Sequence, residues 1–240
     1  MLRVEGRNPV YEALKTSRPT KILISEKTRG APKIQQIIDQ ARKQRIPIEF
    51  VEASELNRIS ETRRHQGVIA LIETPRQASI DQVLSAEGDL CVLLLDRVQD
   101  PMNLGSILRT AEAAGVNGIV IPKKGGVGIT PTVLRASMGA GLRIPVVKTS
   151  LYQTVKLLKG EGAKIIGVDP TGEIEYYDER LIGSLALILG GEGRGLNPTL
   201  LGKCDSVVRI PMTGEVDSLN VGVAAAVVLY ERLRQQRREG

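Results

Sequence analysis

The chain has 240 residues, with 33 Lys plus Arg against 27 Asp plus Glu and a single histidine. This length suits two domains of ordinary size. One histidine, His65, rules out a histidine-based metal cluster, and we expect no metal site and no Ser-His-Asp triad of the usual kind. The six aromatic residues are too scattered for a base-stacking platform.

Residues 1–74 are predicted to form a first α/β domain. Its strand-like runs lie at 21–24, 47–51 and 68–72, and helical patterns separate them. The segment 75–88 is predicted to be a linker with one short helix at 79–84. The remainder, 89–240, is predicted to be the second domain.

Charge separates these two units. Residues 1–80 hold 15 Lys plus Arg against 9 Asp plus Glu, whereas residues 81–240 hold 18 of each. The whole net charge of +6 therefore lies in the first third of the chain. This pattern favours a surface that binds a polyanion such as nucleic acid, and a solvated basic surface is the alternative.

The second domain is predicted to be of the doubly wound α/β class, because strand-like runs alternate largely with helical segments. These runs lie at 90–95, 118–121, 144–147, 164–168, 185–189 and 207–210. Its apolar runs are too short to span a bilayer. Cys91 and Cys204 are interpreted as ordinary intracellular thiols, and we expect a cytoplasmic protein without membrane contact.

A helix is predicted within DRVQDPMNLGSILRTAEAAGV, residues 96–116, with Pro101 and Asn103 near its entry. One face of this helix is apolar at helical spacing, formed by Leu104, Ile107, Leu108, Ala111 and Ala114. Arg109 falls on the opposite side, either as a solvated arginine or as a functional group.

Two loops follow apolar runs late in the chain, LILGGEGRGLNP from Leu187 and IPMTGEVDSLN from Ile210. Glycines in the first loop permit positive φ and close approach to a ligand, although a surface turn would also use them. A phosphate-binding P-loop is excluded, because Leu196 follows Gly195 where Lys would be needed. The carboxylate of Glu192 also disfavours phosphate, and it would accept hydrogen bonds from hydroxyl groups or attract a cation.

The second loop leads into a helix that is apolar on all sides as far as Tyr230. Asp217 or Ser218 is the predicted N-cap, with the helix beginning near Leu219. Asn220 is then a poor helix former in the first turn. This helix is expected to be buried, in the core or against a second subunit.

The three segments around Asn103 and Arg109, around Glu192, and around Ser218 and Asn220 resemble in order the three motifs of the SpoU (TrmH) family. This family belongs to the SPOUT superfamily and comprises RNA 2′-O-ribose methyltransferases. The resemblance covers about residues 90–235. It implies a C-terminal SPOUT α/β domain with a deep trefoil knot, S-adenosylmethionine bound in a bent form, and a homodimer through that domain.

The resemblance also implies site residues. The catalytic group would be Asn103, Arg109, Glu192, Ser218 and Asn220. The cofactor would contact Leu189, Gly190, Glu192, Ile210, Met212 and Leu219. Arg109 would act as a base or, since a guanidinium stays protonated, would bind phosphate and stabilise the developing alkoxide. Ser218 and Asn220 would hydrogen-bond the loops or the ribose, and Glu192 would order the loops.

The first domain resembles the L30e-like substrate-binding domain of the longer family members, through V-E-G-R-N-P-V-Y-E-A-L from Val4 and R-H-Q-G-V-I-A from Arg64. The expected RNA contacts are Arg7, Asn8, Arg63, Arg64, His65 and Gln66. His65 could instead be a hydrogen-bonded turn residue. The two-domain form most resembles enzymes that modify a guanosine of 23S rRNA. The alternatives are a tRNA or antibiotic-resistance methyltransferase, or a non-catalytic RNA-binding or ribosome-assembly protein.

Overall fold

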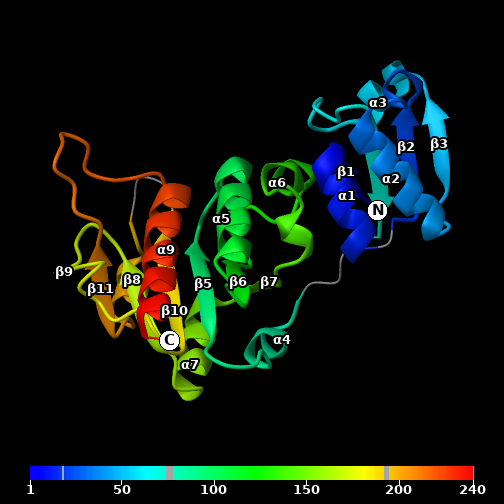
Figure 1. The fold of residues 1–240 in the computed structure, drawn as a ribbon. Coiled ribbons are helices and arrows are strands. Elements are labelled where there is room, and N and C mark those ends of the chain that lie inside the picture. The colour runs from blue at the N-terminus through cyan, green and yellow to red at the C-terminus, as the bar shows by residue number, and fades with distance from the viewer. Residues whose placement is uncertain (18, 74–77, 192–194, 240) are drawn as a thin grey trace. The chain divides into compact units, whose positions relative to one another are not determined.

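The structure is a computed structural model that describes residues 1–17, 19–73, 78–191 and 195–239. The chain divides into two compact units (Figure 1). The N-terminal unit comprises residues 1–76 together with 129–143, and the C-terminal unit comprises 77–128 and 144–240. The sequence-based domain boundaries at 74 and 89 stay a prediction. The first domain predicted from the sequence does not include the segment 129–143.

The N-terminal unit is built on a four-stranded sheet in the order β1-β4-β2-β3. β4 is antiparallel to β1 and β2, whereas β2 and β3 are parallel. The sequence interpretation missed β1, a four-residue strand at the very start of the unit. The elements are β1 (Leu2–Glu5), α1 (Arg7–Thr16), β2 (Lys21–Ser25), α2 (Pro32–Lys43), β3 (Ile48–Val51), α3 (Ala53–Ile59) and β4 (Val68–Ile72).

The core of this unit lies where α1 and α2 pack on the sheet. Ile34, Ile37 and Ile38 recur at helical spacing on α2, and all three are buried against β2 residues such as Ile24. Two short helices from the inserted segment, α6 (Pro131–Ala136) and η2 (Ala140–Leu142), complete the unit, and Leu134 of α6 joins the same core.

The C-terminal unit is a seven-stranded parallel sheet in the order β7-β6-β5-β10-β8-β11-β9. The predicted α/β class is confirmed, although the two-residue edge strand β9 was not foreseen. The elements are α4 (Ile80–Leu84), β5 (Cys91–Asp96), α5 (Pro101–Ala113), β6 (Gly118–Pro122), β7 (Val146–Thr149), α7 (Leu151–Gly160), β8 (Lys164–Val168), β9 (Ile174–Glu175), β10 (Leu185–Gly190), α8 (Pro198–Leu201), β11 (Ser206–Arg209) and α9 (Val221–Glu239).

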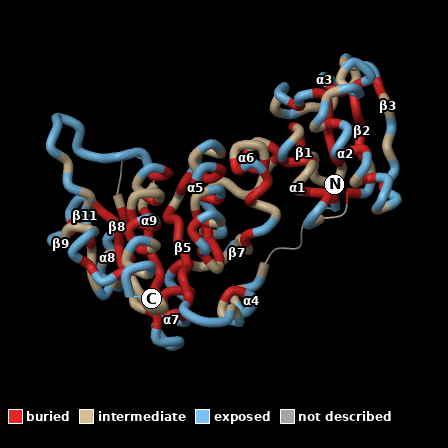
Figure 2. The backbone as a smooth tube through the Cα atoms, in the orientation of Figure 1, coloured by how far each residue is buried: buried red, intermediate tan, exposed pale blue. Residues whose placement is uncertain are grey.

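Helices protect this sheet, so its central strands need no polar face. β5 is buried along its whole length (Figure 2). α5 presents the predicted apolar stripe inward and packs against α9. Because all seven strands are parallel, the carboxyl ends of β8, β10 and β11 meet at one edge, where open α/β sheets bind ligands. In the described part of the chain, no helix is long and apolar enough to cross a membrane.

Candidate active site

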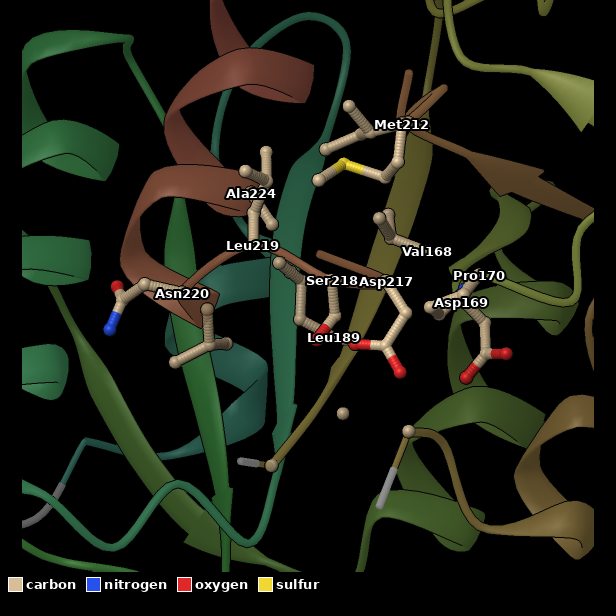
Figure 3. Close-up of a pocket in the computed structure, with 15 residues that line it drawn as sticks. Val168, Asp169, Pro170, Leu189, Met212, Asp217, Ser218, Leu219, Asn220 and Ala224 are labelled. Atoms are coloured by element: carbon tan, nitrogen blue, oxygen red, sulfur yellow. Dashed lines mark hydrogen bonds between the residues drawn. The ribbon is translucent and has the colours of Figure 1, made fainter. Parts of the chain in front are cut away.

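A cavity of about 600 Å³ opens at the carboxyl ends of β8, β10 and β11 (Figure 3). Its wall combines backbone from the glycine loop with apolar side chains. Every described cofactor candidate lines it, namely Leu189, Gly190, Ile210, Met212 and Leu219. The structure thus brings together residues that lie up to thirty positions apart in the sequence, and their role in binding stays a prediction. Glu192, the sixth candidate, lies outside the described residues.

The loop after β10 needs glycine mainly because backbone atoms, from the loop itself and from the residues after β5, approach it closely. A Cβ on Gly190 would lie 2.4 Å from the carbonyl carbon of Gly195, and one on Gly191 would lie 2.6 Å from the carbonyl oxygen of Arg97. Of the loop glycines that the structure describes, only Gly195 has a positive φ, at 61°. Gly190 and Gly191 do not use the positive φ that glycine permits, and crowding is the physical reason for those two glycines.

Asp169, just after β8, holds this loop in place. Its Oδ2 accepts a hydrogen bond from the backbone N–H of Leu196 at 2.7 Å, and its Oδ1 accepts from the backbone and hydroxyl of Thr171 at 3.0 and 2.7 Å. Burial raises the pKa of Asp169, but these hydrogen bonds outweigh it, and the net pKa lies below the ordinary value of 3.8. Asp169 is therefore an ionised carboxylate in the wall of the cavity.

Asn220 caps α9, which corrects the predicted helix start. α9 begins at Val221, and Asn220 Oδ1 accepts hydrogen bonds from the backbone N–H groups of Gly222 at 2.9 Å and Val223 at 3.4 Å. The predicted caps Asp217 and Ser218 lie too far upstream for this role. Asparagine is unfavourable inside the first turn of a helix but is among the preferred residues at the N-cap. Asn220 occupies the N-cap position, which explains why this residue type stands there.

Asn220 also joins two of the predicted catalytic segments. Its Nδ2 donates a hydrogen bond of 2.9 Å to Asn103 Oδ1 in the first turn of α5. The two residues are 117 positions apart in the chain. In Figure 3 the amide of Asn220 points away from Asp169, toward the side of the cavity where α5 lies. Asn220 therefore lines the cavity and connects it to α5.

The two remaining described catalytic candidates occupy different positions. Ser218 is exposed and lines the cavity, and its hydroxyl donates a weak hydrogen bond of 3.4 Å to Asp217. Arg109 is exposed on α5, away from the buried stripe as predicted, and it does not line the cavity. Its role in catalysis stays a prediction.

Sequence reasoning missed the acidic character of this cavity. Asp169 and Asp217 both line it, among apolar side chains such as Val168 and Ala224. The signal for Asp169 was present, since Asp-Pro-Thr-Gly follows a strand-like run and marks a turn. Two carboxylates disfavour a phosphate-rich nucleotide and favour a ligand with positive charge and an apolar body. No cluster of metal-ligating side chains occurs among the residues that the structure describes.

In the N-terminal unit, the predicted RNA contacts gather around one loop. Gln66 Oε1 accepts a hydrogen bond from the backbone N–H of Arg7 at 3.0 Å, and the Gln66 carbonyl accepts from Arg7 Nε at 3.2 Å. Arg63 and Arg64 are exposed, as is Asn8. His65 is buried as a hydrogen-bonded turn residue, the alternative that its sequence position left open.

Two family profiles divide the chain in a similar way. The profile of the SpoU rRNA Methylase family matches residues 90–230, and the profile described as RNA 2'-O ribose methyltransferase substrate binding matches residues 3–78. The fold and the cavity thus belong to a two-domain RNA methyltransferase. The chain is a member of the SpoU (TrmH) family, and the predicted resemblance and enzyme class are confirmed.

Relatives match over nearly their whole length. A protein of Staphylococcus aureus (strain COL), assigned to the TrmH family of tRNA/rRNA methyltransferases, is 41% identical over 239 residues, which cover 97% of this chain and 96% of that protein. The TrmH family protein YacO of Bacillus subtilis is 39% identical over 239 residues, covering 97% and 95%.

Solved structures share the architecture. The SpoU methyltransferase AviRb from Streptomyces viridochromogenes, in complex with the cofactor AdoMet, matches with a TM-score of 0.84 and 25% identity over 99% of this chain and 91% of that one. A solved RNA 2'-O ribose methyltransferase matches with a TM-score of 0.84 and 29% identity over 98% and 88%. The α/β architecture with a small N-terminal domain is therefore that of known SpoU methyltransferases.

Proposed function

We propose that this protein transfers a methyl group from S-adenosylmethionine to the 2′-hydroxyl of a ribose in structured RNA, most specifically a guanosine of 23S rRNA. The observation that carries the proposal is the hydrogen bond between Asn103 and Asn220 beside the cavity. It joins the first and third family motifs at the edge of a cavity whose wall holds the cofactor candidates. A protein that had lost the catalytic activity would not need to retain this hydrogen bond.

The chemistry of the cavity fits S-adenosylmethionine. Leu189, Ile210 and Met212 offer apolar surface for an adenine ring, and Gly190 brings its backbone to the cavity wall without a side chain of its own. The carboxylates of Asp169 and Asp217 suit the positive charges of the sulfonium and amino groups. When bound, the cofactor supplies an electrophilic methyl group on a cationic sulfur.

Arg109 would orient the substrate. A guanidinium stays protonated, so its natural partners are the phosphate next to the target ribose and the alkoxide that develops as the hydroxyl loses its proton. Asn103, Asn220 and Ser218 would hold the ribose in line with the methyl group, and such positioning lowers a barrier by several kcal/mol, on the order of 7–11 in favourable cases. We propose Glu192 as the residue that orders the two loops.

The basic N-terminal unit supports binding of structured RNA. Residues 1–80 carry the whole net charge, and Arg7, Arg63 and Arg64 lie around a single loop. With few aromatic residues for base stacking, recognition should depend on phosphate, ribose and RNA shape. Affinity should therefore fall steeply with added salt.

We also propose a homodimer formed through the C-terminal unit, a deep trefoil knot and a cytoplasmic location. Apolar side chains along α9 that remain exposed in the single chain support the dimer, since Val223 is 49% and Tyr230 52% exposed. The close approach of Gly191 to the backbone of Arg97, which is far away in the sequence, is consistent with chain segments that cross closely in a knot. Light scattering would test the dimer, because a monomeric mass at micromolar concentration would contradict it.

Incubation with methyl-labelled S-adenosylmethionine and separate unmodified 23S rRNA and tRNA transcripts tests the function. We expect label in 23S rRNA, located by nuclease mapping at the 2′-oxygen of a guanosine. Label in tRNA alone would favour the tRNA alternative, and label at another rRNA nucleotide that confers drug resistance would favour the resistance type. Binding of rRNA without transfer of label to either RNA would favour the non-catalytic alternative.

A further inference from the structure

A fully buried carboxylate lies beneath the loop that carries the proposed RNA contacts. Glu5, the last residue of β1, is 0% exposed. Its oxygens accept hydrogen bonds from the backbone N–H of Glu61 at 2.7 Å, the hydroxyl of Ser60 at 2.7 Å, and both the backbone and hydroxyl of Thr62. A charge without water is stable only when donors surround it in this way. The loop is therefore built around Glu5.

The two hydroxyl groups extend this influence to the arginines. Ser60 Oγ accepts a hydrogen bond from the backbone N–H of Arg63 at 2.9 Å, and Thr62 Oγ1 accepts from that of Arg64 at 3.2 Å. Each hydroxyl has one proton, which it donates to Glu5, so its lone pairs are left to receive the arginine backbone. Glu5 thus fixes the backbone of Arg63 and Arg64 through two short relays.

The rest of the loop is equally constrained. Arg63 and Gln66 both have a φ of 53°, a left-handed conformation that side-chain-bearing residues seldom adopt unless their surroundings impose it. His65 Nδ1 accepts a hydrogen bond from the backbone N–H of Gly67 at 3.1 Å, and His65 Nε2 lies 2.9 Å from Asn57 Oδ1. The backbone of this loop is thus held by several hydrogen bonds, while the side chains of Arg63 and Arg64 are exposed.

We propose that Glu5 is a positioning residue for RNA binding, which holds the 60–66 loop so that Arg63 and Arg64 present their guanidinium groups to phosphates of a structured RNA. This inference rests on the proposed RNA-binding function. A prearranged loop loses less conformational entropy when it binds than a mobile one does. The fork of a guanidinium matches a phosphate only when its backbone is correctly placed.

The test exploits the sign of the charge. Glu5→Gln removes a negative charge beside the RNA surface, so electrostatics alone predicts tighter binding of an anion. If Glu5 positions the loop, binding should instead weaken, by about tenfold, because the amide of Gln cannot accept all four hydrogen bonds. The matched control is Glu61→Gln in the same loop, whose exposed carboxylate pairs only with Arg3, at 3.0 Å, among the ion pairs found in the described residues. We expect no weakening in the control.

Filter binding of an unmodified 23S rRNA transcript would measure affinity as a function of salt. Loss of a phosphate contact lowers the slope of log affinity against log salt by about 0.7–0.9 per contact. A merely structural role would reduce the folded fraction without changing that slope. Since Glu5→Gln could impair folding, Ser60→Ala and Thr62→Val provide a second route, because each removes one relay and leaves the carboxylate in place. For these two variants we expect a three- to tenfold loss of affinity and unchanged binding of S-adenosylmethionine, on the order of one hydrogen bond each.

The double variant Arg63→Ala, Arg64→Ala separates the possible failures. If it binds rRNA as the unaltered protein does, the proposed RNA role of this loop is wrong. If it binds weakly while Glu5→Gln, Ser60→Ala and Thr62→Val retain full affinity and slope, the RNA role stands and the positioning role of Glu5 is overturned. Weakening in all of these variants, with Glu61→Gln unaffected, is the expected result.

Discussion

In each unit a buried carboxylate holds a loop, but the two loops present different groups. Glu5 holds the loop 60–66 in the N-terminal unit, and Asp169 holds the glycine loop in the C-terminal unit. Burial raises the pKa of each carboxyl, yet hydrogen bonds leave both pKa values below normal. In both cases the carboxylate lies at or just beyond a strand end. Glu5 accepts two backbone N–H groups from a distant segment, and Asp169 accepts one.

The difference lies in what each loop presents. Glu5 accepts from two hydroxyl groups as well as two backbone N–H groups, and the hydroxyls in turn accept from the backbone of Arg63 and Arg64, whose side chains are exposed. Asp169 acts on the backbone at Leu196 and packs against Gly195, so its loop presents backbone to a cavity. Backbone groups and small residues can contact a ligand closely inside a cavity, whereas long side chains can reach the phosphates of an extended polyanion.

The largest effect is expected from Arg109→Lys. This variant tests whether turnover can be impaired without weakening the binding of cofactor and RNA, which we assign to the two loops. Lysine keeps the charge but loses the bidentate geometry. We expect turnover to fall about 100-fold or more, as for loss of a preorganised donor. Affinities for S-adenosylmethionine and rRNA should change little, as measured by calorimetry and filter binding.

Arg180→Lys is the matched control for this variant, because the Arg180 side chain is 73% exposed and forms a surface ion pair with Glu239. It should leave turnover unchanged. Near-normal turnover of Arg109→Lys would remove the bidentate role assigned to Arg109.

Asp169→Asn should weaken binding of S-adenosylmethionine by about tenfold. An amide has a single acceptor oxygen, so it cannot accept the hydrogen bonds of both Leu196 and Thr171. The lost charge-assisted hydrogen bond is worth about 1.5–3 kcal/mol. Affinity for rRNA should stay unchanged. Asp217→Asn removes a charge from the same cavity without a backbone contact of this kind among those described. Equal weakening in both variants would mean that charge, and not the shape of the loop, is what Asp169 contributes.

Asn220→Ser should separate the two roles of Asn220. Serine caps a helix as well as asparagine does but is too short to reach Asn103, whereas Asn220→Ala loses the cap as well, at a cost of about 1 kcal/mol. We expect turnover to fall several-fold in both variants, on the order of one lost hydrogen bond, and urea unfolding to detect destabilisation in the alanine variant alone. Normal turnover of Asn220→Ser would reduce Asn220 to a capping residue.

Much of the fold could be predicted because its central elements follow local rules. β5 and β10 are continuous apolar runs, and α5 has a regular stripe, so periodicity alone locates them. β1 and β9 have only four and two residues and owe their existence to pairing with β4 and β11, which no local pattern reveals. The grouping of segment 129–143 with the N-terminal unit likewise depends on tertiary packing of residues such as Leu134.

The candidate site was predictable only in part. The family motifs led to Asn103 and Asn220, whose hydrogen bond now joins two segments. Glu5 was missed because a single acidic residue within a strand has no distinctive spacing. The sequence around Asp169 marks a turn but does not reveal which backbone groups its carboxylate accepts from. Their importance comes from three-dimensional surroundings, namely burial together with several donors from other segments.

The smallest expected effect is a pH dependence at the Glu5 loop. Burial lowers the pKa of His65 below 6.5, and the nearby carboxylate of Glu5 partly opposes this by raising it. The unfolded chain therefore binds a proton more readily than the folded one, so stability should fall as pH drops from about 6.5 toward the depressed pKa and should level off below it. A protonated His65 could no longer accept the hydrogen bond from Gly67.

Glu5 should act in a different pH range. Its folded pKa lies below 4.5, so the stability it contributes is present above pH 4.5 and is lost only as pH falls through that lower value. Urea unfolding between pH 7 and pH 5 thus isolates His65. His65→Asn is the matched variant, since its side-chain oxygen still accepts from Gly67 but does not titrate. The variant should lose less stability than the unaltered protein over this range, and parallel curves would show that His65 does not couple the loop to pH.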